Sequence, residues 1–211
     1  MNSLTDPRRN DYFTLVDTSS VPNVQKLAYS GGIYGRSNPF TKYSHINPTI
    51  SSPTYPGILL SYDEVLFYEA EASARSFSVG DTPNALYNAA ITASILAWGG
   101  TSDQASAYLS QPGVAYATAT GTWQQKIGTQ AYFAFYSRGL EGCTEWRRLD
   151  WPILNLPPTI TDYNLIPKRF TYPIKEQTLN KANYTTTFIT LPDFAYITSM
   201  PVLLFPAHNF L

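Results

Sequence analysis

Cysteine and histidine are scarce in this chain of 211 residues, which contains one Cys, Cys143, and two His, His45 and His208. A single cysteine excludes both a disulfide within the chain and a cysteine-based zinc site. Because the two histidines are far apart in the sequence, we expect no structural metal. No motif calls for a cofactor, and we expect none.

Charge is also low, with 14% charged residues and a formal net charge of -1. The Lys and Arg residues form no basic stripe, which argues against nucleic acid as a partner. No apolar run of about 18 residues is present, so the sequence predicts no membrane-spanning helix. The first residues also lack the apolar core of a secretory signal, and this abrupt start is what we expect of a fragment.

Aromatic residues are abundant, at 15% of the chain, with 16 Tyr, 11 Phe and 4 Trp. A surface rich in Tyr and poor in charge suits flat, hydroxylated or apolar ligands. A core and rim rich in tyrosine would give the same composition. The composition alone leaves both interpretations open.

The distribution of turn residues divides the chain into three parts. Gly and Pro turn signals predict a loop-rich segment over residues 1–57. Helical patterns follow over 58–151, and an irregular tail over 152–211 completes what we treat as one incomplete domain. A helix is expected to start near Ser61, because Ser61 and Glu64 have the spacing of a capping box.

A second helix is expected from Thr82 to Trp98, with no charged residue after its start. The short turn before it predicts an antiparallel helical hairpin. A short helix is expected over residues 102–109, a third long helix over 122–137 and a fourth over 140–149.

Helical spacing also predicts which faces are buried. On the first helix the predicted buried face consists of Tyr62, Leu66, Ala70, Ala74 and Phe77. On the second helix a stripe of small residues is predicted to be core, namely Leu86, Ala89, Ala90, Ala93 and Ala97.

Several short motifs follow one another in a characteristic order. They are Asp6-Pro7-Arg8, the run Ser61 to Ala72, Gln111-Pro112-Gly113, Trp146-Arg147-Arg148 with Trp151-Pro152, and Arg169 to Pro173 followed by Asn180 and Asn183-Tyr184. In this order and spacing, residues 58–184 resemble the SusD/RagB family of nutrient-binding proteins of the bacterial outer membrane. Each motif alone is weak, and the specificity lies in their order.

The resemblance implies an all-α fold of tetratricopeptide-like helical hairpins with long irregular loops, of which this chain would lack the N-terminal half. It implies a lipid anchor, in that missing half, on the surface of a Gram-negative cell. It also implies a TonB-dependent transporter barrel, SusC-like, as the partner. Family ligands are mostly glycans and sometimes peptides, so the resemblance implies a binding protein and not an enzyme.

The C-terminal tail departs from the family pattern. From Ala182 to Leu211 the only Asp, Glu, Lys or Arg is Asp193, whereas the family ends on a charged segment that contains Trp. We therefore expect that the residues after about Tyr184 are not the ancestral ending.

The best ligand candidate is the loop between Tyr29 and Tyr55, where aromatic and hydrogen-bonding side chains alternate with turns. Its candidate ligand-binding residues are Tyr34, Arg36, Asn38, Tyr43, His45 and Tyr55. Sugars stack an apolar face on aromatic rings, while Asn and Arg supply hydrogen bonds to hydroxyl groups. The alternative is an ordered loop whose tyrosines pack over the helices.

Signals for catalysis are poor, and no candidate catalytic residue emerges. Glu141 and Glu145 lie on one helical face, where an ion pair of Glu145 with Arg148 is a simpler interpretation than a glycosidase pair. Arg147 and Arg148 fit a helix C-terminus that favours cations, and Cys143 fits a packed thiol. A tetratricopeptide-like module that binds proteins or peptides remains the first alternative to glycan binding, and a glycoside hydrolase the second.

Overall fold

The computed structural model describes residues 1–20, 25–155 and 172–190. The chain forms two compact units. The first comprises Met1–Gly32 and Asn38–Ile153, and the second comprises Ile33–Ser37 and the chain from Leu154 onward. No helix in the described ranges is both long and apolar enough to cross a membrane.

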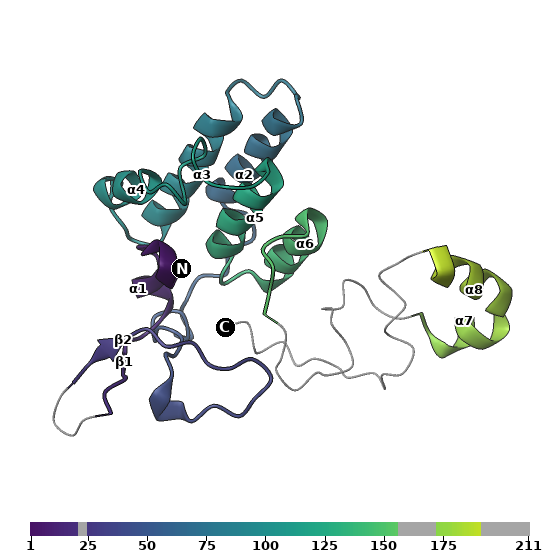
Figure 1. Ribbon diagram of the computed structural model, residues 1–211, viewed down its shortest axis with the longest axis horizontal. Coiled ribbons are helices and arrows are strands. Elements are labelled where there is room, and N and C mark those ends of the chain that lie inside the picture. The colour runs from purple at the N-terminus through teal and green to yellow at the C-terminus, as the bar shows by residue number, and fades with distance from the viewer. Residues whose placement is uncertain (21–24, 156–171, 191–211) are drawn as a thin grey trace. The chain divides into compact units, whose positions relative to one another are not determined.

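The first unit is built from five helices that follow one another along the chain. They are α2 (Tyr62–Ala74), α3 (Pro83–Ala97), α4 (Ser102–Leu109), α5 (Trp123–Ala134) and α6 (Gly139–Leu149). Figure 1 shows α2 and α3 as an antiparallel hairpin, and α5 contacts both of these helices. The prediction of a partial all-α fold with a helical hairpin is confirmed.

Short elements precede these helices, and a small hairpin of helices belongs to the second unit. The N-terminal elements are η1 (Asn2–Leu4), α1 (Arg9–Tyr12), β1 (Val16–Asp17), β2 (Leu27–Ala28) and η2 (Phe40–Lys42). Strands β1 and β2 pair antiparallel, with Val16 opposite Ala28. In the second unit, α7 (Ile174–Leu179) is followed by α8 (Lys181–Thr190). The prediction that the residues after about Tyr184 are not the ancestral ending concerns mostly residues 191–211. These residues lie outside the described part of the chain.

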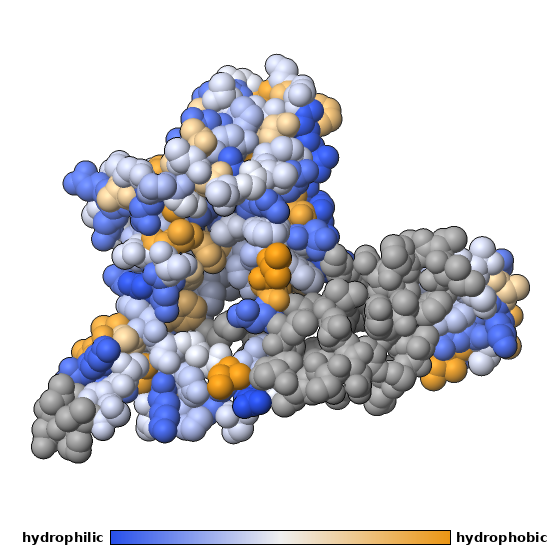
Figure 2. All heavy atoms as spheres, viewed as in Figure 1, coloured by the Kyte–Doolittle hydropathy of each residue, from blue (hydrophilic) through white to orange (hydrophobic). Residues whose placement is uncertain are grey.

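The apolar core lies where α3 packs against its neighbours. Tyr87, Ile91 and Ile95 of α3 are fully buried, together with Phe67 of α2 and Ile127 of α5. In the view of Figure 2, hydrophobic groups on the outside of these helices are scattered among hydrophilic and neutral residues. The uncharged sequence of α3 is therefore explained by packing on several sides.

The start of α2 differs from the sequence prediction. Ser61 precedes the helix but makes no capping hydrogen bond through its side chain, and its buried hydroxyl has no partner among the described residues. Glu64 instead accepts hydrogen bonds from Arg138 and Tyr68. The predicted capping box is wrong, because a buried arginine from a distant segment competes successfully for the carboxylate. A capping box does form at α4, between Thr101 and Gln104.

The predicted buried face of α2 is also partly wrong. Leu66 and Ala70 are buried as expected, but Tyr62 and Phe77 are 71% and 67% exposed. Their place is taken by charged side chains, since Asp63, Glu64 and Glu71 are all buried. These carboxylates face arginines of other segments, and apolar periodicity along one helix cannot reveal such partners.

The small-residue stripe of α3 is correct only in part. Leu86 and Ala90 are buried, whereas Ala89 and Ala97 are exposed. The buried side of α3 instead carries larger residues, Tyr87, Ile91 and Ile95, together with Ser94. Ala89 and Ala97 therefore lie outside the packed face, where a small side chain is not required.

The N-terminal segment is attached to the helices by a buried arginine. Arg8 and Asp6 form an ion pair with a nitrogen–oxygen distance of 2.6 Å, and neither side chain is exposed. The guanidinium of Arg8 also donates to the Ser94 hydroxyl of α3 at 3.0 Å and to the Gln130 side-chain oxygen of α5 at 3.1 Å. The segment that carries α1 is thus fixed against two helices of the core.

Candidate ligand-binding site

Five aromatic side chains gather at one end of the helices and are called the aromatic cluster below. They are Tyr12, Phe13, Tyr55, Trp98 and Tyr136. The ring of Tyr12 stacks on that of Tyr136 with centroids 4.5 Å apart, and it meets Trp98 edge-on at the same distance. Tyr55 lies nearly parallel to Trp98 with centroids 6.5 Å apart. Tyr12 is fully buried, while the other four rings remain partly accessible.

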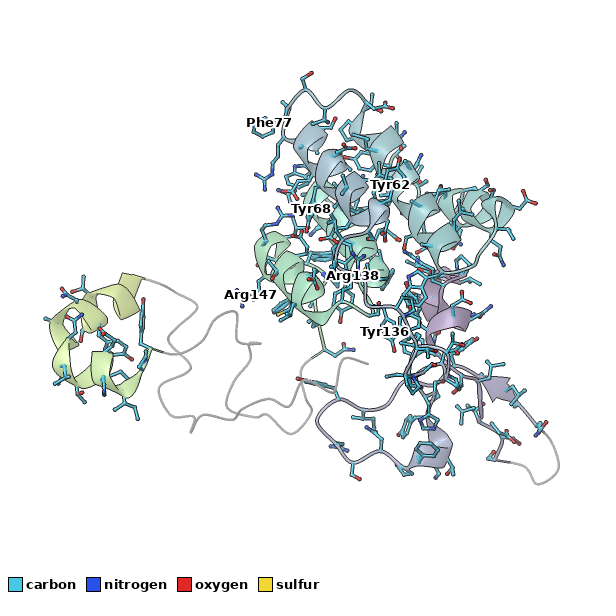
Figure 3. The ribbon with its side chains drawn as sticks, turned by 180° about the vertical axis from the view of Figure 1, so that it is seen from behind. Tyr62, Tyr68, Phe77, Tyr136, Arg138 and Arg147 are labelled. Carbon is cyan, nitrogen blue, oxygen red and sulfur yellow. The ribbon has the colours of Figure 1, made fainter. Side chains whose placement is uncertain are left out.

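Segments far apart in the sequence bring these rings together. Tyr12 ends α1, and its hydroxyl donates a 2.9 Å hydrogen bond to the carbonyl of Phe133. Trp98 follows the last turn of α3, and Tyr136 follows α5, where Figure 3 labels it beside the loop region. Tyr55 comes from the loop before α2. The buried ion pair of Arg8 holds α1, so it also positions Tyr12 in the cluster.

Burial raises the pKa of the phenols of the cluster. It raises the pKa of Tyr136 to about 12 and also raises the pKa of Tyr55. Both rings are neutral at physiological pH, as they also would be at the ordinary tyrosine pKa of about 10. The buried hydroxyl of Tyr136 has no hydrogen-bond partner among the described residues. A set of neutral, half-buried rings is suited to stacking on the apolar face of a ligand.

Among the predicted ligand residues, Tyr55 lies in the aromatic cluster and His45 lies close to it in the fold. The ring of His45 stacks on that of Phe40 with centroids 3.7 Å apart, and its Nε2 is 2.8 Å from the Phe40 carbonyl oxygen. The carbonyl of His45 accepts a hydrogen bond from the amide of Thr14, next to Phe13. The loop and α1 are thereby joined by backbone pairing.

The other predicted residues are distributed over both units. Tyr43 is partly buried in the first unit. Asn38 is exposed, and its amide group lies against Gly32, where an added Cβ would be 3.0 Å from Nδ2. Tyr34 and Arg36 belong to the exposed turn Ile33–Ser37 of the second unit. Their role in a site remains a prediction.

Sequence reasoning missed four members of the cluster, namely Tyr12, Phe13, Trp98 and Tyr136. Trp98 and Tyr136 were assigned to helices, and Tyr12 and Phe13 carry no local signal that separates them from other aromatic residues. Only the packing of α1 against the ends of α3 and α5 reveals them. No spacing rule within one segment could have found this group.

A second surface feature is a shallow hollow of about 290 Å³ between α2 and α6. It is lined by Tyr68, Glu71, Ala72, Arg75, Phe77 and Arg148. Arg148 of α6 forms ion pairs with Glu71 of α2 and with Glu145, which confirms the predicted pairing of Glu145 with Arg148. Arg75 pairs with Glu71 as well, at 2.8 Å.

The family model for SusD-like proteins, described as "Starch-binding associating with outer membrane", matches residues 1–173. The chain belongs to the SusD-like family. This match confirms the resemblance that the ordered motifs indicated. No curated protein matches the chain.

Solved structures of SusD-like proteins show the same fold. A SusD homologue of Bacteroides thetaiotaomicron is 24% identical with a TM-score of 0.66, covering 90% of this chain and 46% of its own. A chitin-binding SusD homologue from Flavobacterium johnsoniae is 25% identical with a TM-score of 0.61, covering 92% and 46%. A SusD-like protein titled "Bacteroidetes AC2a SusD-like" is 28% identical with a TM-score of 0.58, covering 72% and 31%. The chain thus spans less than half the length of these structures.

The ion pairs of the hollow make the stability of this SusD-like chain depend on pH. Burial acts to raise the pKa of Glu71, but hydrogen bonds from Arg148 and Arg75 outweigh burial and lower it below its ordinary value of 4.5. A carboxylate with a depressed pKa in the folded state stabilises the fold above its unfolded pKa, and this stability is lost as the pH falls through the folded pKa. We therefore expect the free energy of unfolding to decline as the pH falls below about 4.5.

Replacing Arg148 by methionine tests whether the ion pairs of Glu71 cause this pH dependence of stability. Because Arg148→Met removes the main cation from Glu71, the loss of stability below about pH 4.5 should be smaller than in the parent. Urea unfolding between about pH 6 and about pH 3 measures the difference. Arg147→Met, which changes an exposed neighbour on α6, should retain the parent's pH dependence. Equal slopes for Arg148→Met and the parent would contradict the assignment.

Proposed function

We propose that this chain is part of a binding protein that captures neutral glycans at the outer membrane. The observation that carries the proposal is the aromatic cluster, in which Tyr55, Trp98 and Tyr136 keep partly accessible, uncharged rings. The rings can stack on the C–H faces of sugars.

The family supports this choice of ligand class. Its description is starch-binding, and two similar structures are titled as chitin-binding, each 25% identical with TM-scores of 0.65 and 0.61. Starch and chitin are both uncharged polysaccharides, so the neutral cluster fits either chemistry. Oligosaccharides of both polysaccharides are therefore used in the binding experiment.

Import completes the proposed role. Association with the outer membrane is part of the family description. We infer that the chain belongs to a lipid-anchored surface protein that passes its ligand to a TonB-dependent SusC-like transporter. The proposal involves binding without chemistry. It is supported by the position of Glu145, whose carboxylate is buried and paired with Arg148 and so is not presented to a sugar.

Glycan affinity of tyrosine variants tests the site. Isothermal titration with maltohexaose and with chitohexaose should detect binding to the parent. Tyr55→Ala should weaken that binding by on the order of 1 kcal/mol, about five-fold in Kd, because one stacking ring is lost. Tyr34→Ala and Tyr43→Ala test the remaining loop tyrosines in the same way.

Two control variants separate binding from folding. Tyr62→Ala changes an exposed tyrosine outside the cluster and should leave both affinity and stability unchanged. Tyr87→Ala removes a core ring and should act through stability, which thermal unfolding reports. If all three loop variants bind a glycan as tightly as the parent does, the site lies elsewhere.

A further inference from the structure

The hollow between α2 and α6 presents aromatic surface that the core does not use. Phe77 is 67% exposed and Tyr68 is 39% exposed, although both flank the same depression. Figure 3 shows them on the same side of α2, with Phe77 near the turn that leads to α3. Exposed rings beside a hollow whose floor includes the small residue Ala72 leave room for a flat ligand to lie between them.

The polar wall of the hollow is rigid. The guanidinium of Arg148 is held by Glu71 and Glu145, so its orientation is fixed by two carboxylates from two helices. Tyr68 is held as well, because its hydroxyl donates a 3.0 Å hydrogen bond to Glu64. These contacts fix the wall before any ligand arrives, which reduces the entropy lost on binding.

Arg75 supplies the hollow with hydrogen-bond donors for a ligand. Its Nε donates to Glu71 at 2.8 Å, and its guanidinium lies over the Trp123 ring, 4.9 Å from the centroid. Within the described ranges, no hydrogen bond engages its two terminal nitrogens. Its side chain is 48% exposed. Arg75 is thus oriented by two contacts while four N–H groups stay free to meet acceptors on a ligand.

The charge and the volume of the hollow indicate which class of ligand it can bind. Two arginines and one carboxylate, Glu71, line the hollow, and Glu145 outside the lining pairs with Arg148. Two carboxylates therefore balance the two arginines, which leaves little net charge with which to select an anion. A volume of about 290 Å³ lies near the lower end of small-molecule sites, enough for about one or two sugar rings. Aromatic rims with a fixed donor and little net charge suit a neutral, hydroxylated ring.

We propose that this hollow is a second contact for a neutral glycan chain. The rings of Phe77 and Tyr68 would cover the sugar, and Arg75 would donate to its hydroxyl groups. The proposal rests on the proposed function, since it assumes that the protein binds glycans. The two proposed contacts use different residues, because the hollow and the aromatic cluster have no residue in common. A chain that spans both contacts would gain affinity from each.

The test uses the side-chain N–H signals of Arg75 and Trp123 in ¹⁵N-labelled protein titrated with maltohexaose or chitohexaose. Both signals are expected to shift in the parent and still to shift in Tyr55→Ala at higher glycan concentration. Phe77→Ala should abolish the shifts and weaken the overall Kd about five-fold, as expected for one lost aromatic contact. Leu140→Ala, a matched change at an exposed apolar residue of α6, should do neither.

The outcomes separate this proposal from the proposed function. If a glycan binds and Tyr55→Ala weakens it, but the Arg75 and Trp123 signals stay in place, the second contact is refuted and glycan binding stands. Shifts with trigalacturonate but not with the neutral oligosaccharides would overturn the neutral-ligand assignment. If neither oligosaccharide binds the parent at all, both proposals fail together.

Discussion

Replacing Arg8 by methionine is expected to lower the free energy of unfolding by about 3–5 kcal/mol. The variant leaves the carboxylate of Asp6 buried without its cation, and it removes a donor from Ser94 and from Gln130. A loss of this size is a large part of the stability of a typical domain, about 5–15 kcal/mol. It should also free α1 and disturb the stacking of Tyr12 in the aromatic cluster.

Urea unfolding followed by circular dichroism measures this effect. Arg147→Met serves as the matched control, because Arg147 is exposed on α6 and should change stability by no more than about 0.5 kcal/mol. The double variant Asp6→Leu with Arg8→Met should recover part of the loss, since no lone charge then remains in the interior. A single Arg8→Met variant as stable as the parent would show that the pair contributes nothing.

The helices were predicted well where local signals and packing agree. For α3, Thr82 accepts a hydrogen bond from the amide of Ala85, and Pro83 occupies the first turn as its sequence predicts. The bounds of α4 coincide with residues 102–109. In both cases the capping residues and the apolar pattern favour the same structure, so tertiary contacts did not override them.

Predictions failed where distant charges decide the structure. The predicted capping box at Ser61 is absent because Glu64 turns inward to Arg138. Phe77 lies beyond the end of α2 at Ala74, so the predicted helical face does not extend to it. The sequence identified Asp6 and Arg8 only as part of a family motif and did not predict that they pair. In the structure they form the buried ion pair that fixes the N-terminal segment. A pair of this kind depends on contacts such as Arg8 with Gln130, which no pattern within one segment encodes.

Of the residues in the aromatic cluster, the sequence predicted only the one that comes from the loop, Tyr55. A Tyr-rich loop with turn residues pointed to Tyr55, and the structure places Tyr55 beside Trp98. Trp98 and Tyr136 join the cluster because α3 and α5 end close together, which follows from the packing of α5 against the hairpin. Their sequence context is that of ordinary helix ends, so their position in the cluster follows from the fold alone.

The second large effect is expected at Arg138, where α6 begins. Its guanidinium lies 3.5 Å from an oxygen of Asp63 and also pairs with Glu64, and all three side chains are about 5% exposed. Arg138→Met would leave two carboxylates buried close together without a cation. We expect the free energy of unfolding to fall by about 3–5 kcal/mol, with little rescue by salt because buried charges are weakly screened.

A double-mutant cycle identifies the pair as the cause. In the parent, Glu64→Gln should destabilise the protein, because it removes the negative charge that pairs with Arg138 and leaves one acceptor oxygen where Arg138 and Tyr68 each use one. In the Arg138→Met background, the same change should cost less or stabilise the protein, because it removes a lone charge. Urea unfolding of the four proteins gives the coupling free energy. A coupling near zero would show that Arg138 acts through packing against the Phe135 ring, whose centroid lies 4.4 Å away, and not through its charge.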